Sequence, residues 1–67
     1  MEFPCRIGQV IKIRGRNRIK WINFGFDIGA NYNIKDAVIV KDWRQLDALL
    51  QYLGHYQGLQ GVFVESV

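Results

Sequence analysis

The strongest constraint on the fold is an alternating run of residues near the start of the chain. Basic side chains occupy all five even positions from 12 to 20, and isoleucine or tryptophan occupies four of the six odd positions from 11 to 21. Successive side chains of a β-strand point to opposite faces, so this pattern predicts a β-hairpin with one basic face. The basic face would consist of Lys12, Arg14, Arg16, Arg18 and Lys20. The residues expected to face the core are Ile11, Ile13, Ile19 and Trp21.

The turn of this hairpin decides which side chains meet across the two strands. A two-residue loop at Arg16 and Asn17 would pair Ile13 with Lys20 and mix the two faces. A loop with an odd number of residues keeps apolar side chains opposite one another. We therefore predict a three-residue loop with Asn17 or Gly15 at positive φ.

The other elements are predicted from hydrophobic periodicity and turn signals. Residues 25–33 are rich in turn formers yet carry three large apolar side chains, which is unusual for a connection. The apolar run at 37–40 indicates a central strand that is buried on both faces. The predicted elements are strands at 8–15, 18–26, 34–40 and 61–67 and one helix at about 43–53.

The helix has a clear start and a clear apolar stripe. Asp42 is a suitable N-cap, and Gln45 follows at the capping-box spacing. Gly54 is placed to end the helix in the left-handed conformation. The stripe that should face the core consists of Trp43, Leu46, Leu49, Leu50 and Leu53.

Together these elements describe a β-rich α+β fold, in which a small bent antiparallel sheet or partial barrel has the order β-β-β-α-β. The 67 residues form a single small domain in which 1–6 is a loose N-terminal arm. The predicted core consists of Trp21, Val38, Val40, Leu46, Leu50 and Leu53.

The charge is unevenly distributed along the chain. Residues 1–20 carry six basic side chains and one acidic one, a net charge of +5, whereas residues 21–67 carry three basic and five acidic, a net charge of −2. A concentrated basic face indicates a polyanionic partner. The alternative is a solvated outer face that keeps a small apolar protein soluble.

The side chains that catalysis or metal binding requires are scarce. There is no threonine, and Ser66, His55 and Cys5 are the single serine, histidine and cysteine. We therefore predict that the protein is not an enzyme and has no metal site and no cofactor. The lone cysteine and the lack of a long apolar run indicate a cytoplasmic protein that does not cross a membrane.

The order of the elements is similar to that of the OB-fold nucleic-acid-binding modules. Two short runs carry the resemblance: the first strand opens at Ile7, Gly8, Gln9 and Val10, and the second closes at Trp21, Ile22, Asn23, Phe24 and Gly25. The resemblance implies an OB/SH3-like partial barrel that binds nucleic acid over strands two and three. It carries binding roles to Arg14, Arg16, Arg18, Lys20, Trp21 and Tyr32, and extends to Lys35 and Tyr56.

The resemblance and the charge pattern together predict a small basic module that contacts single-stranded DNA or RNA. Cations neutralise phosphates, and exposed aromatic rings stack on bases. The residues predicted to make these contacts are Lys12, Arg14, Arg16, Arg18, Lys20, Phe26 and Tyr32. The chain departs from the OB barrel because only one strand follows the helix. A partner could supply the missing strand, and we therefore expect a homodimer.

A second hypothesis is a protein–protein interaction module, such as an inhibitor or a small assembly subunit. It would use the apolar loop 25–33 together with exposed aromatic side chains, because aromatic residues are common interface anchors. Its partner would be an acidic protein, which a basic face fits as well as it fits a nucleic acid. The aromatic candidates are Trp43, Tyr52 and Tyr56.

Overall fold

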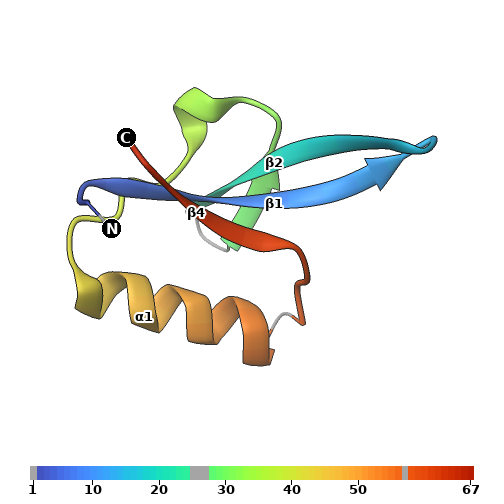
Figure 1. The fold of residues 1–67 in the computed structure, drawn as a ribbon. Helices are drawn as coiled ribbons and strands as arrows, with labels where there is room; N and C mark the ends of the chain where they lie inside the picture. The colour runs from blue at the N-terminus through green and yellow to red at the C-terminus, as the bar shows by residue number, and fades with distance from the viewer. Residues whose placement is uncertain (1, 25–27, 57) are drawn as a thin grey trace.

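The fold is an open four-stranded antiparallel sheet with one helix packed on one face (Figure 1). The computed structural model describes residues 2–24, 28–56 and 58–67. The strand order in the sheet is β3-β2-β1-β4, so β3 and β4 are the edges. The elements along the chain are β1 (Cys5–Ile13), β2 (Arg16–Phe24), β3 (Ile28–Asn31), the 3-10 turn η1 (Ile34–Asp36), α1 (Trp43–Gln51), the π-helical turn η2 (Tyr52–Tyr56) and β4 (Val62–Ser66). The fold is therefore of the α+β class.

Strands β1 and β2 form a hairpin whose turn differs from the prediction. Ile13 pairs with Arg16, which leaves a two-residue loop of Arg14 and Gly15. Both loop residues have positive φ, 53° and 79°, as in the type I′ turn that matches the twist of a hairpin. The prediction of a three-residue loop with Gly15 or Asn17 at positive φ was therefore wrong in its length, although Gly15 does adopt that conformation.

The two-residue turn also changes which side chains share a face. Residues directly opposite in an antiparallel pair point to the same side of the sheet, and Lys12 lies opposite Asn17 while Ile11 lies opposite Arg18. Even positions of β1 and even positions of β2 therefore lie on opposite faces. The prediction of one face carrying all five basic residues was wrong. Lys12 is on one face, and the basic side chains of β2 are on the other.

The register is set by the buried end of the hairpin. Ile7 and Ile22 follow directly on the Gly8–Trp21 pair, and both are fully buried under the helix. The isoleucines nearer the turn lie beyond the helix-covered core, and Ile13 remains 39% exposed. The expectation that Ile11, Ile13 and Ile19 face the core was therefore wrong, because the core covers only the other end of these strands.

The third strand lies earlier in the chain than predicted. β3 is formed by Ile28–Asn31, inside the segment expected to be a loop, whereas the predicted strand 34–40 begins with a 3-10 turn. The last residues of this predicted strand, 38–40, lie between the start of β1 and the end of β2, where these two strands no longer pair with each other. The Val38 N–H donates to the Ile22 carbonyl at 2.9 Å, and Val40 exchanges two backbone hydrogen bonds with Cys5.

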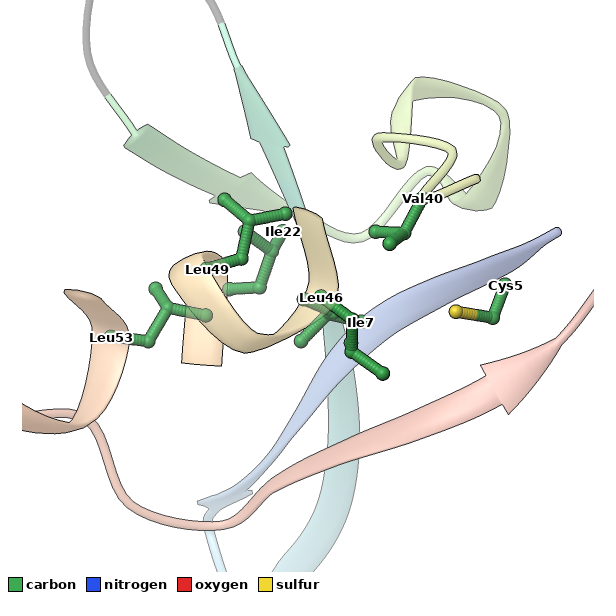
Figure 2. Close-up of a cluster of buried hydrophobic side chains, with 7 residues drawn as sticks. All are labelled: Cys5, Ile7, Ile22, Val40, Leu46, Leu49 and Leu53. Carbon is green, nitrogen blue, oxygen red and sulfur yellow. The ribbon is translucent and has the colours of Figure 1, made fainter. Parts of the chain in front are cut away.

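The core lies between the sheet and α1 (Figure 2). Of the six predicted core residues, Val40, Leu46 and Leu53 belong to the buried cluster, and Val38 and Leu50 pack against it while partly exposed. The full cluster is Cys5, Ile7, Ile22, Val40, Leu46, Leu49 and Leu53.

Trp21 is buried on the other face of the sheet. It is 8% exposed and meets Phe63 edge to face, with 5.8 Å between the ring centres. A Cβ at Gly8 would lie 2.5 Å from the Phe63 ring, so the two rings pack over a residue without a side chain. The Arg6 guanidinium also lies over Trp21, at 5.1 Å from the ring centre. Trp21 is thus buried as predicted, but outside the main core.

The helix begins as predicted and ends differently. The Asp42 carboxylate accepts a hydrogen bond from the Gln45 N–H at 2.8 Å, which is an N-cap. Gly54 lies within η2 and is not among the residues with positive φ, so its predicted role as a left-handed terminator was wrong. Trp43 was expected in the buried stripe but is 61% exposed and stacks edge to face on Phe3. Among the described residues, no helix has the length and apolar character to cross a membrane.

Candidate nucleic-acid interface

The part of the hairpin nearest the turn extends beyond the rest of the sheet. β1 pairs with β4 only up to Gln9 and Val62, and β2 meets β3 only from Trp21 and Asn31 onward. Residues 11–19, which we call the distal hairpin, therefore form a two-stranded ribbon that projects away from the helix (Figure 1). Residues 12–19 of this ribbon are all exposed.

Three arginines surround an open hollow on the distal hairpin. Arg14 comes from the turn, and Arg16 and Arg18 come from alternate positions of β2, so the last two share one face. Ile13, directly opposite Arg16, completes the lining. The hollow has a volume of about 590 Å³. It combines an aliphatic side chain with three planar guanidinium groups.

These three arginines have no anionic partner within the described residues. The ion pair found among these residues joins Arg6, near the start of β1 and away from the turn, to Glu65 at 2.8 Å. Cations gathered on one surface repel one another, and an anionic ligand relieves that repulsion while accepting hydrogen bonds from the guanidinium forks. The hollow, which we call the arginine hollow, is therefore chemically suited to phosphate or carboxylate groups.

An aromatic ring lies beside the arginine hollow. The Arg18 guanidinium is 4.9 Å from the centre of the Tyr32 ring, and the Lys20 ammonium is 5.5 Å from it. Both cations come from the same face of β2, and Tyr32 follows the end of β3, the strand that pairs with β2. Because Tyr32 is 46% exposed, part of its surface is available to a ligand.

The structure brings together five of the seven predicted contact residues and adds one residue that sequence reasoning missed. Arg14, Arg16, Arg18 and Tyr32 lie around or beside the hollow, and Lys20 flanks Tyr32. The additional residue is Ile13, which was assigned to the core. No sequence signal marks this role, because it depends on where β3 and β4 stop pairing with the hairpin.

Other residues given binding roles lie elsewhere. Lys12 projects from the opposite face of the hairpin, and the buried ring of Trp21 is not available for stacking. Lys35 is exposed on η1. Phe26 lies outside the described residues, and so does the side chain of Tyr56.

The lone cysteine is buried away from solvent, and the described residues form no metal-binding group. Cys5 is fully buried in the core, and this desolvation raises the pKa of its thiol, which keeps the thiol protonated. In that part of the chain no group of three or more His, Cys, Asp or Glu residues is placed to hold a metal ion.

Comparison with known proteins finds no significant match. No protein-family model matches the chain, and neither a curated protein nor a solved structure matches it significantly. What the chain binds must therefore follow from its own residues and their geometry.

Proposed function

We propose that the protein is a non-enzymatic module that binds single-stranded nucleic acid through the distal hairpin. The observation that carries the proposal is the set of three arginines around one hollow, with no carboxylate partner among the described residues and with the half-exposed Tyr32 nearby. Phosphate groups would occupy the arginine hollow. A base would stack on the tyrosine ring, a contact that contributes about 1–3 kcal/mol by alanine substitution.

A single strand suits this surface because its phosphates and its bases are both accessible from one side. Arg16 and Arg18 are two positions apart on β2, so they follow a backbone laid along that strand. Arg18 can also stack with a base, since its guanidinium already lies against an aromatic ring. None of these contacts reads base edges, so we expect little sequence preference.

The finer fold assignment, a partial barrel of the OB or SH3-like kind, is part of this proposal. Its support is the separation of β1 from β2 and the placement of the segment 38–40 between them. Val38 bonds to Ile22 on one side, and Val40 bonds to Cys5 on the other. Such a separation bends a sheet towards closure.

Binding to an acidic protein is the second candidate, and the exposed Trp43 favours it. This ring lies at the start of α1, which is not part of the distal hairpin, so an interface built on it would be a different surface. Tyr52 also keeps part of its side chain exposed. The two candidates therefore predict contacts at different residues.

Amide chemical-shift mapping separates the two candidates. A short single-stranded oligonucleotide added to isotopically labelled protein should shift the amides of the distal hairpin and of Tyr32, while those of α1 stay in place. An acidic peptide of equal charge serves as the control ligand. Shifts confined to α1 and the Trp43 region, or shifts with the peptide alone, would overturn the proposal in favour of a protein partner.

A further inference from the structure

Edge strand β4 has a free side whose backbone groups can be identified from the hydrogen bonds on its other side. Val10 donates to the Gly61 carbonyl, and Val67 donates to the Pro4 carbonyl, so positions 61 and 67 point towards β1. Backbone groups alternate in direction along a strand, and positions 63 and 65 therefore also point towards β1. The residues that point away from the sheet are Val62, Val64 and Ser66.

Within the part of the chain that the structure describes, β4 has few of the usual protections of an edge strand. The strand has the sequence VFVES, which contains no proline or lysine, and its pairing with β1 is regular from one end to the other. Its single charge, Glu65, is held by Arg6 through a 2.9 Å hydrogen bond within a salt bridge, so it is partly neutralised. Little therefore prevents another strand from pairing with this edge.

We infer that β4 pairs with β4 of a second copy of the chain, in antiparallel orientation about a two-fold axis at Val64. In this register Val64 faces its own counterpart, and Val62 faces the partner's Ser66. The outward N–H and C=O groups of both strands are then all paired, because the three outward positions are symmetric about the axis. Two copies of β4 therefore present the same three outward positions to one another, with Val64 on the axis.

Side chains on both faces agree with this pairing. The Phe63 side chains of the two copies lie diagonally across the new strand pair, within reach of each other. They extend the aromatic contact that Phe63 makes with Trp21 in each copy. Glu65 would lie opposite the partner's Phe63 and remain bonded to Arg6. On the helix-covered face, half-buried Val62 and Val64 gain apolar neighbours. The result is one continuous eight-stranded sheet from which the two distal hairpins project in opposite directions. This inference does not depend on the proposed nucleic-acid binding.

A proline placed at an outward position tests the pairing. Ser66→Pro removes an N–H that points away from β1, so the bonds within one chain remain. Ser66→Ala is the matched control, because it also removes the hydroxyl that donates to the Glu2 carbonyl but keeps the N–H. In sedimentation equilibrium the wild type and Ser66→Ala should approach a mass of twice 7.8 kDa, while Ser66→Pro should dissociate about tenfold or more readily. A wild type that stays at 7.8 kDa up to millimolar concentration would overturn the inference.

Hydrogen exchange gives a second readout that needs no variant. In a monomer the amides of Phe63 and Glu65 are protected by β1, whereas those of Val62, Val64 and Ser66 exchange freely. Raising the protein concentration should slow exchange at these three outward amides and leave the inward ones unchanged. A dimer whose outward β4 amides stay unprotected would place the interface elsewhere and contradict the inference.

Discussion

Replacing Arg16 and Arg18 together by alanine is expected to weaken binding of single-stranded nucleic acid by at least about tenfold at low salt. Both residues line the arginine hollow, so their replacement removes two of the three basic side chains around it. The dependence of log affinity on log salt should become less steep by about 1.4, from about 0.7 per phosphate contact. The melting temperature should change little, because both side chains are exposed and neither holds an ion pair within the described residues. Fluorescence anisotropy with a labelled oligonucleotide measures the first two effects.

The matched control is the double replacement of Lys41 and Arg44 by alanine. It lowers the net charge of +3 by the same two units, but these residues lie at the start of α1, which is not part of the distal hairpin. We expect this variant to keep most of its affinity and nearly the same salt dependence. Equal losses in the two double variants would show that only the overall charge matters, and would argue against a localised site.

Leu46→Ala is expected to have the largest effect on stability. Leu46 is 1% exposed at the centre of the cluster between α1 and the sheet, and its truncation leaves a cavity (Figure 2). The expected loss is about 2–5 kcal/mol of the free energy of unfolding. A domain of this length is stable by roughly 3–10 kcal/mol, so this truncation should remove a large fraction of the total stability. Urea denaturation followed by circular dichroism gives the value.

Trp43→Ala provides the comparison, since it removes a larger side chain from the same helix. Because 61% of Trp43 is exposed and its recorded ring contact is with Phe3, we expect a loss of about 1 kcal/mol or less. If Trp43→Ala cost more than Leu46→Ala, the placement of the helix on the sheet would be wrong.

Local signals in the sequence were sufficient to locate the helix and its start. The Asp42 cap depends on residues only three positions apart, and the leucine stripe depends on a period that holds wherever the helix packs. Trp43 was wrongly included because periodicity shows which side of the helix a residue lies on, but not how deeply the residue is buried. Trp43, the first residue of the stripe, lies outside the core and packs against Phe3.

The hairpin register could not be found from the same kind of pattern. The alternation near the turn favoured pairing isoleucine with isoleucine. That end of the hairpin is not buried by the core, so such pairing would stabilise it little. Burial of Ile7 and Ile22 at the other end decides the register, and the turn at Arg14 and Gly15 accommodates it. A glycine at the second turn position is a hairpin signal even without a preceding asparagine.

The third strand was misplaced because its sequence has weak strand propensity. Ile28–Asn31 contains a glycine, an alanine and an asparagine, and it forms a strand because β2 offers it an edge. The more apolar segment at 37–40 contributes to the core instead, with Val40 fully buried. Tertiary contacts therefore place the strand in the segment with the weaker strand propensity.

The candidate site was predictable in composition but not in shape. Charge counting identified Arg14, Arg16, Arg18 and Lys20, since it needs no register. Their grouping around a hollow, and the separation of Lys12 from them, follow from the two-residue turn and could not be obtained without it.

Titration of the wild-type protein with a labelled single-stranded oligonucleotide over a range of salt concentrations tests the central claim most directly. If about four cations, Arg14, Arg16, Arg18 and Lys20, contact phosphates, log affinity should fall with log salt with a slope of about −2.8. The slope should be the same for oligonucleotides of different sequence, because the contacts are to the backbone. An absence of binding to both single-stranded DNA and single-stranded RNA at about 50 mM salt would contradict the account.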